Sequence, residues 1–368
     1  MECIVFLMPT ATHPRFIKRI KSAKKCFDRV VVFSYIRDRN NYGSMLDGVD
    51  FHPLPKVKDG NYLLRPFHLA RSIIKVASFI RKEGLVVNCA YAFNLETAYI
   101  GGVVFGWSKM CLEVGDLVST KLNLLRRPYK ITERFVLKSV HRVIVTSDAY
   151  LDFWEKVYKV KVKHKAVVIE NKLDSSILNL HADDASDTPI SASNAKLRIG
   201  LIGVLRYRQI EYLINAVTSR PESLELHVWG VGDYAPVLQK IADEHTNINF
   251  YGSFSNPSDL PSIYNSIHLN FVMYDTAIEN VRLALPNKLY ESLYFNKPMV
   301  VSHDTELCRQ VSLHDAGFCV QDTPDAILEF FSNIDRQSVE QLAEGLSRAD
   351  SSWCIHSDQE FMDLITHL

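Results

Sequence analysis

Short apolar runs alternate with amphipathic stretches along almost the whole chain, and this pattern limits the possible folds more than any other feature. The stretches between the runs have helical periodicity, as in the basic segment RFIKRIKSAKK at 15–25. Alternating strands and helices favour parallel sheets covered by helices. The sequence therefore predicts an α/β protein with strands at 3–9, 29–35, 85–91, 109–115, 142–147, 166–171, 197–203, 224–230, 248–254, 267–274 and 297–302.

Residues 181–196 interrupt this pattern, because they are small, polar and acidic, which is typical of a surface linker. A chain of 368 residues, 47% of them apolar, is long enough for two domains. We expect one doubly wound domain over 1–180 and a second over 197–349, with helices in the tail 350–368. Ligands of such folds bind at the carboxyl ends of the strands, so two facing sheets would place a binding cleft between them.

The two halves of the chain carry opposite charges although the formal net charge is zero. Residues 1–180 hold 30 Lys and Arg against 16 Asp and Glu, a balance of +14, so the remainder carries −14. A strongly basic half points to an anionic partner, which is either a nucleic acid or an anionic membrane surface.

The cysteines and the apolar runs bear on the cellular compartment. The seven cysteines include no CxxC spacing, so we expect buried free thiols rather than a disulfide framework or a zinc site. No apolar run approaches the ~18–20 residues of a membrane-spanning helix. The first residues lack the basic region of a signal peptide. We therefore expect a cytoplasmic protein.

The segment ALPNKLYESLYFNKPMVVS, at 284–302, predicts a helix that begins near Pro286 and leads into a buried strand. The free N–H groups of such a helix end attract phosphate, and Lys288, next to Asn287, adds a full positive charge. Glu291 follows three residues after Lys288, which puts both side chains on one face. A carboxylate in that place can accept hydrogen bonds from a ribose diol. This helix end suits a nucleoside diphosphate, although an ordinary solvated surface helix fits the pattern equally well.

The segment IGVLRYRQIEYLINAV, at 202–217, places Arg206 and Arg208 in the loop after a strand that ends at Gly203. Arginines there can bind the same diphosphate with two parallel hydrogen bonds. The nearby WGVGDY, at 229–234, contains a Gly-x-Gly after a strand, which by itself is a weak nucleotide signature.

Together these segments and YGSFSNPSDLPSIY, at 251–264, resemble the donor domain of GT-B glycosyltransferases, in particular glycosyltransferase family 4. The first half adds weaker likenesses in HPRFIKRIKSA (13–23), LEVGDL (112–117) and ITERFVLKSVHRVIVTS (131–147). The resemblance implies two Rossmann-like domains facing a central cleft. It also implies transfer of a sugar from a nucleotide donor, commonly a UDP-sugar, to an acceptor held by the N-terminal domain, with no metal or other cofactor.

In such proteins a cation after the first donor-domain strand meets the diphosphate, which implies this role for Arg206 or Arg208. The glutamate of the PxKLYE helix contacts the ribose, which implies that role for Glu291. The final helix, including the segment around Trp353, would cross back to the first domain. The sequence departs from the family pattern at the glutamate that contacts the donor sugar. Leu283 stands there, with Asn280 and Glu279 as the nearest polar residues.

Asp116 is the best candidate for a catalytic base, because it follows a predicted strand at the edge where ligands bind. Glu113 on the same strand is the alternative. Asp116 can equally be a residue that fixes a loop or caps a helix. A retaining enzyme needs neither carboxylate, because the leaving diphosphate can take the proton, and positive charge around it would then carry catalysis. Many family members have a histidine where this chain has Gly115.

The basic segments 15–25, 121–130 and 156–165 all belong to the predicted acceptor domain. They favour a polyprenyl-diphosphate-linked or saccharide acceptor and a peripheral position at the inner face of an anionic plasma membrane. We therefore expect a retaining transferase of polysaccharide synthesis. Three alternatives stay open: an inverting transferase with Asp116 as base, a UDP-sugar 2-epimerase, and a nucleic-acid-binding module. No nucleic-acid motif supports the last.

Overall fold

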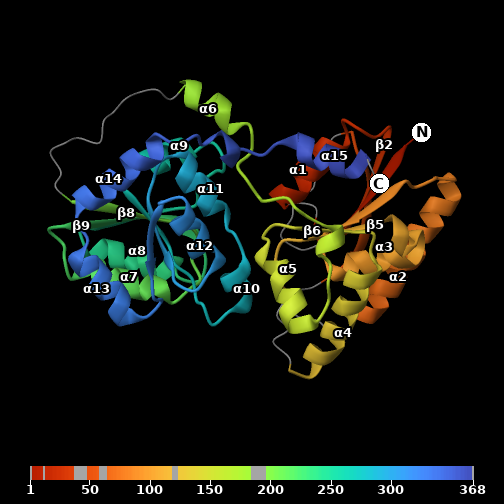
Figure 1. Ribbon diagram of the computed structural model, residues 1–368, viewed down its shortest axis with the longest axis horizontal. Helices are drawn as coiled ribbons and strands as arrows, with labels where there is room; N and C mark the ends of the chain where they lie inside the picture. The colour runs from red at the N-terminus through yellow and green to blue at the C-terminus, as the bar shows by residue number, and fades with distance from the viewer. Residues whose placement is uncertain are drawn as a thin grey trace. The chain divides into compact units, whose positions relative to one another are not determined.

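The computed structural model describes residues 2–10, 13–36, 48–57, 64–117, 123–183 and 196–366. It divides into two compact units, which are Met1–Glu170 with Ser357–Leu368, and Asn171–His356 (Figure 1). Each unit is a parallel sheet with helices on both faces, so the predicted α/β class is confirmed. Among the described residues, no helix combines the length and hydrophobicity that a membrane crossing requires.

The first unit is built on a seven-stranded sheet in the order β3-β2-β1-β4-β5-β6-β7. Central β1 is buried along its whole length, with Phe6 opposite Val32 of β2 and Tyr91 of β4. The elements are β1 (Cys3–Met8), α1 (Pro14–Ala23), β2 (Arg29–Ile36), β3 (Asp50–Lys56), α2 (Arg65–Glu83), β4 (Cys89–Ala92), α3 (Leu95–Phe105), β5 (Met110–Val114), α4 (Asn123–Ser139), β6 (Arg142–Val145), α5 (Ala149–Phe153), β7 (Ala166–Val168) and α15 (Asp358–Thr366).

The C-terminal helix α15 packs in the first unit beside α1 (Figure 1). Phe361 is fully buried, with its ring 5.4 Å from that of Tyr91. Asp358 accepts hydrogen bonds from the Ser22 hydroxyl at 2.5 Å and the Lys25 ammonium at 2.6 Å. These contacts anchor the end of the chain on the face that α1 covers.

The second unit is built on a six-stranded sheet in the order β10-β9-β8-β11-β12-β13. One apolar cluster joins the sheet to α7 and α13, and another joins the opposite face to α9, α11 and α12. The elements are α6 (Ile177–Asp183), β8 (Leu197–Val204), α7 (Gln209–Thr218), β9 (Leu224–Val231), α8 (Ala235–Glu244), β10 (Ile248–Gly252), α9 (Leu260–Asn265), β11 (Leu269–Val272), α10 (Glu279–Leu283), α11 (Asn287–Tyr294), β12 (Met299–Ser302), α12 (Glu306–Leu313), β13 (Gly317–Val320), α13 (Pro324–Asn333) and α14 (Arg336–Ser347).

The predicted strands form, but the sequence reading missed β3 and β13. β3 has the sequence DFHPLPK, and two prolines argue against a central strand because proline cannot donate a ladder hydrogen bond. β3 tolerates them because it is an edge strand. β13 is also an edge strand and has only four residues, too few for a visible alternation.

The division between the units falls after Glu170, ahead of the linker expected at 181–196. Leu173 and Ile177 are buried in the apolar cluster of the second unit, which explains why the chain enters that unit earlier. Residues 184–195 of the expected linker lie outside the described residues. Trp353 also stays in the second unit, where its ring stacks on that of His314 at 4.8 Å. Of the C-terminal tail, the part that belongs to the first unit begins at Ser357.

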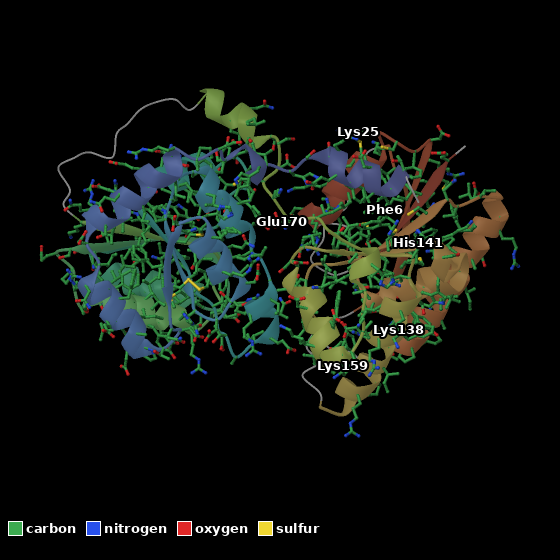
Figure 2. The ribbon with its side chains drawn as sticks, in the orientation of Figure 1. Phe6, Lys25, Lys138, His141, Lys159 and Glu170 are labelled. Carbon is green, nitrogen blue, oxygen red and sulfur yellow. A yellow bond between two sulfur atoms is a disulfide. The ribbon has the colours of Figure 1, made fainter. Side chains whose placement is uncertain are left out.

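The expectation of free thiols is wrong for two of the seven cysteines. Cys308 on α12 and Cys319 on β13 form a disulfide with their Cα atoms 5.6 Å apart (Figure 2). A spacing of eleven residues gave no signal, because the two positions meet only once α12 has packed beside β13. The cysteines outside this disulfide are Cys3, Cys89, Cys111 and Cys354, which are buried, and Cys26, which is partly exposed.

Candidate functional site

The strand order of the second unit fixes where a ligand can bind. β8 lies between β9 and β11, so the chain leaves β8 and β11 toward opposite faces of the sheet. Doubly wound sheets bind ligands at the carboxyl ends of two such strands. Here those ends carry the loop with Arg206 and Arg208, and the loop that begins at Met273.

Two glycines at the end of β9 and just after it hold the loop after β8 in place. A Cβ atom on Gly230 would lie 1.9 Å from the Gly203 oxygen, and one on Gly232 would lie 2.4 Å from the Leu205 oxygen. This close approach lets Leu205 donate a backbone hydrogen bond to Val231 at 2.9 Å and accept one from Tyr234 at 3.1 Å. The Gly-x-Gly therefore positions the residue before Arg206, a structural role that the sequence signal alone left open.

Helix α11 begins at Asn287, as the proline rule predicts, and its N-cap residue Pro286 makes no side-chain capping hydrogen bond. Lys288 forms an ion pair with Glu291 one turn later, and the Tyr264 hydroxyl donates to the same Glu291 oxygen at 2.8 Å. Glu291 is 2% exposed, whereas the side chain of Lys288 keeps 12% exposure. Asn270 extends this buried network by donating to Tyr264 at 3.3 Å.

Gly203 brings the end of β8 next to Lys288. A Cβ atom at Gly203 would lie 3.7 Å from the Lys288 Cε, and the backbone of Gly203 has φ +126°. A left-handed φ of this kind strains any residue with a side chain. Glycine thus leaves the end of β8 open beside the lysine stem, which brings two predicted site residues together.

Tyr274, just after β11, is partly buried and packs against the apolar cluster that includes Leu289 and Tyr290 of α11. Burial raises the pKa of its phenol, the nearby oxygens of Tyr207 and Glu291 raise it further, and the Arg206 guanidinium lowers it. The rings of Tyr207 and Tyr274 are 5.1 Å apart. Arg206 donates to the Tyr207 hydroxyl at 2.7 Å. The charges of Arg206 and Glu291 therefore both affect the pKa of this partly buried phenol.

The other residues predicted to bind the donor, which are Arg208, Asn287 and Asn280, have different surroundings. Arg208 is fully exposed, and a hydrogen bond to Tyr212 together with the charge of Asp275 raises its pKa. Asn287 accepts from the Asn171 side-chain amide at 2.7 Å. Asn280 lies within the short helix α10 and is partly exposed.

Sequence reasoning missed the tyrosines and Ser302. Tyr264 lies on α9 and Tyr274 follows β11, so no local spacing connects them with Glu291. The Ser302 hydroxyl at the end of β12 accepts from the Tyr274 N–H and donates to its carbonyl, both at 2.8 Å. The segment SDLPSIY, which carries part of the family resemblance, contained the only signal, since it ends at Tyr264.

In the first unit, Glu113 is a buried structural residue, which corrects its interpretation as an alternative base. It is fully buried and accepts from Arg19 Nε at 3.1 Å and the Tyr91 hydroxyl at 2.6 Å, with Arg15 Nε 3.2 Å away. Burial would raise its pKa, but the charges of Arg19 and Arg15 and the Tyr91 hydrogen bond bring it below the ordinary value. No oxygen of this carboxylate reaches the surface, so it cannot meet an acceptor.

Asp116 is exposed at the end of β5, next to a tightly filled site at Gly115. A Cβ atom on Gly115 would lie 1.6 Å from Arg15 Nη1. Arg15 thus fills the space that the histidine of other family members would need. His13 lies near Asp116, and burial followed by the Arg15 charge lowers the His13 pKa to about 4, against an opposing effect of Asp116. His13 is therefore neutral at neutral pH, and the sequence reading overlooked it as a proton acceptor.

Comparisons with known proteins agree with this architecture. Residues 196–334 match the family model described as Glycosyl transferases group 1. Across the whole chain, the fold matches sucrose-phosphate synthase from Thermosynechococcus elongatus with a TM-score of 0.72, at 12% identity and 98% coverage of that chain. It also matches Anabaena HepE in complex with UDP and glucose, with a TM-score of 0.70, at 15% identity and full coverage of both chains. The chain is a GT-B glycosyltransferase.

A curated relative extends the likeness to the transferase's sequence. The succinoglycan biosynthesis protein ExoL of Rhizobium meliloti is 23% identical over 336 residues, which cover 86% of this transferase and 81% of that protein. The family match includes the arginine loop, the Gly-x-Gly and all of α11. The residues around Tyr274 therefore lie inside the segment that carries the family assignment.

Proposed function

We propose that this transferase moves a sugar from a UDP-sugar to a lipid-linked or saccharide acceptor during synthesis of a surface polysaccharide, with retention of configuration at the anomeric carbon. The donor part of the proposal rests on Arg206 and Glu291, which both act on the pKa of Tyr274, and on Lys288, which is ion-paired with Glu291. Two comparisons support it: a structural relative was solved with UDP and glucose, and ExoL is named for succinoglycan biosynthesis.

The donor's diphosphate would lie at the uncapped N-terminus of α11. The helix end and the charges of Lys288 and Arg206 are the positive groups there. Glu291 would accept hydrogen bonds from the ribose, with Tyr264 holding the carboxylate in place. Binding the diphosphate would give Lys288 a second anionic partner besides Glu291.

Catalysis would follow from stabilising the leaving group. Negative charge grows on the UDP oxygen as the glycosidic bond breaks, and preorganised cations at that oxygen lower the barrier. The departing diphosphate would take the proton of the attacking hydroxyl, so no protein base is required. We expect the same cations to make a metal ion unnecessary, and UDP release in the presence of EDTA tests this directly.

The acceptor would be held by the basic first unit. We propose that this unit also adsorbs to an anionic membrane surface, where each nearby Lys or Arg contributes ~1 kcal/mol. Several of these cations already have partners, such as Lys163, which is 2.6 Å from Asp152, so the surface attraction is smaller than the sequence count suggests.

An inverting reaction is the second candidate, and one observation favours it. Asp116 is exposed and lies near His13, which is neutral at neutral pH and can accept a proton. In that reaction His13 or Asp116 would remove the acceptor's proton as the sugar is transferred. An Asp116→Asn variant would then lose transfer activity, whereas the retaining proposal predicts only a modest change.

The experiment supplies purified protein with a panel of UDP-sugars and a membrane lipid extract, and measures UDP release and the anomeric configuration of the product by NMR. The proposal expects acceptor-dependent UDP release and a product with the donor's configuration. Inverted configuration would favour the second candidate. Conversion of UDP-GlcNAc to its 2-epimer without any acceptor would contradict both.

A further inference from the structure

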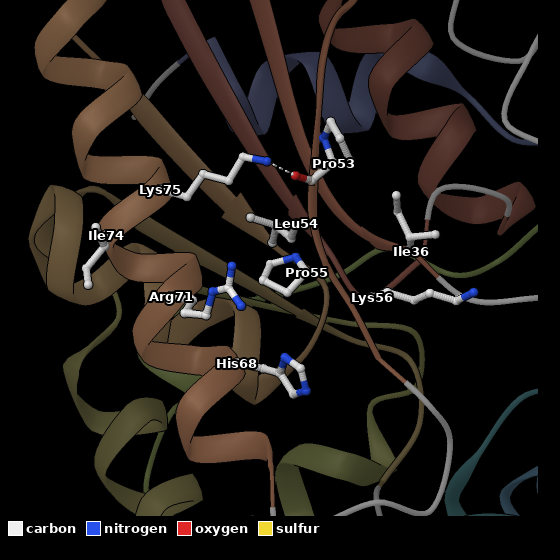
Figure 3. A pocket seen from close by; sticks show the side chains of 9 residues that line it. All are labelled: Ile36, Pro53, Leu54, Pro55, Lys56, His68, Arg71, Ile74 and Lys75. Carbon is white, nitrogen blue, oxygen red and sulfur yellow. Dashed lines mark hydrogen bonds between the residues drawn. The ribbon is translucent and has the colours of Figure 1, made fainter.

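The first unit contains a pocket of about 570 Å³ between helix α2 and the edge strand β3 (Figure 3). This volume lies within the range of small-molecule sites, roughly 300–1,000 Å³. Ile36, the last residue of β2, and Pro55 near the end of β3 line it, so the pocket opens at the carboxyl edge of the sheet. Ligands of doubly wound sheets bind at that edge.

The charged side chains that line the pocket are all cationic. Lys56 comes from β3, and Arg71 and Lys75 come from α2 together with His68. The spacing of His68, Arg71 and Lys75 puts them on one face of the helix, which Figure 3 shows turned toward β3. His68 Nδ1 is buried and has no hydrogen-bond partner within the described part of the chain. Among the described residues that line the pocket there is no aspartate or glutamate, so their charges favour an anion.

The remaining lining residues are apolar. Pro53, Leu54 and Pro55 form a rigid wall on β3, and Ile74 on α2 is 66% exposed beside the pocket. Phe67, one turn before Arg71, is 59% exposed and lies 5.6 Å from its guanidinium. Exposed apolar side chains next to a cationic pocket suit a ligand that joins an anionic group to an apolar chain.

We propose that this pocket binds the phosphate-bearing end of the acceptor's lipid carrier. Arg71 and Lys75 contact the phosphate oxygens, His68 donates or accepts through its unpartnered ring nitrogen, and the first isoprenoid units lie on Pro53, Pro55 and Ile74. Lys75 currently donates to the Pro53 carbonyl, which holds its ammonium at the pocket (Figure 3). The inference rests on the proposed function, because it places the lipid-linked acceptor that the proposed reaction requires.

Isothermal titration of the full-length protein with farnesyl diphosphate tests the assignment, with inorganic diphosphate and farnesol as partial ligands. We expect farnesyl diphosphate to bind at least about tenfold more tightly than either partial ligand, because only it satisfies both halves of the pocket. Arg71→Ala should weaken binding about five- to tenfold. Lys82→Ala, which removes an exposed charge from the same helix, should leave binding unchanged, and both variants should keep the wild-type melting temperature.

Several results would overturn the assignment. If farnesyl diphosphate binds no more tightly than inorganic diphosphate, the pocket does not recognise the isoprenoid chain. If Arg71→Ala binds farnesyl diphosphate as tightly as the wild type, the ligand does not bind in this pocket. Loss of adsorption to phosphatidylglycerol vesicles in Arg71→Ala, without any farnesyl diphosphate binding, would assign the pocket to membrane headgroups instead. UDP binding measured in the same samples separates these failures from failure of the donor site, since Arg71 belongs to the other unit.

Discussion

Lys288 and Glu291 form an ion pair across one turn of α11, and both side chains are largely buried. The pair stands at the uncapped N-terminus of that helix and beside Gly203 of β8. A lysine ammonium carries three donors, so Lys288, whose ion pair in the described part of the chain is with Glu291, keeps donor capacity for a second anion.

Removing the charge of Lys288 should weaken UDP binding. Lys288→Met keeps the apolar stem beside Gly203 but removes a charge-assisted hydrogen bond to the diphosphate, so Kd for UDP should rise by roughly tenfold or more. Lys240→Met, which removes an exposed lysine from α8, is the matched control and should bind UDP normally. Equal affinities of the two variants would show that Lys288 does not contact the nucleotide.

Glu113 should matter for stability and not for nucleotide binding. Glu113→Gln leaves Arg15 and Arg19 as buried, uncompensated cations, so the free energy of unfolding of the first unit should fall by about 3 kcal/mol. Urea unfolding followed by tryptophan fluorescence measures the loss, and calorimetric titration with UDP should give the wild-type Kd. A Glu113→Gln variant that keeps its stability but loses its transfer activity would instead show that Glu113 takes part in catalysis.

Two glycines should respond oppositely to alanine. Gly115→Ala places a methyl group where Arg15 Nη1 now lies and should destabilise the protein by about 2 kcal/mol. Gly345 lies inside helix α14 with nothing within 4 Å of a built Cβ, so Gly345→Ala should stabilise it by about 0.5–1 kcal/mol. Melting temperatures of both variants check the signs, and a neutral Gly115→Ala would mean that Arg15 is not fixed against Gly115.

Stability should fall as the solution is acidified from about pH 6.5. Burial lowers the pKa of His268 to about 3, and burial with the Arg15 charge lowers that of His13 to about 4. The unfolded chain then binds more protons than the folded chain between those values and about 6.5, so the free energy of unfolding decreases toward acid through this window.

His268→Asn should flatten the pH dependence, because it removes the proton uptake of the unfolded state at this position. Urea unfolding at about pH 7 and about pH 5 measures the slope, in a range above most carboxylate pKa values. The exposed His245 provides the control substitution His245→Asn. If the pH dependence of the free energy of unfolding changes equally in His268→Asn and His245→Asn, burial of His268 is not its cause.

The parts of the site that depend on local sequence could be predicted. Pro286 fixed where α11 begins, and a spacing of three residues put Lys288 and Glu291 on one face. The strand before Arg206 was visible as an apolar run. Each of these features involves residues within about one helical turn, where periodicity and capping rules apply.

The parts that depend on long-range packing could not be predicted. Tyr264 reaches Glu291 across 27 residues, and Arg19 reaches Glu113 across 94. No sequence spacing shows that two arginines of α1 will enclose a carboxylate of β5, so Glu113 looked like a base. For the same reason the sequence could not show that Arg15 packs against Gly115, because only the fold brings these two residues together.

The central claim is that Arg206 and Glu291 serve one nucleoside diphosphate, and calorimetric titration of UDP into paired arginine variants tests it most directly. Arg206→Ala should raise Kd for UDP by about tenfold or more, since it removes a charged donor from the group around Tyr274. Arg208→Ala, whose side chain bonds to Tyr212, should change Kd by less than about threefold. Failure of the wild-type protein to bind UDP, or a larger loss in Arg208→Ala than in Arg206→Ala, would contradict the account.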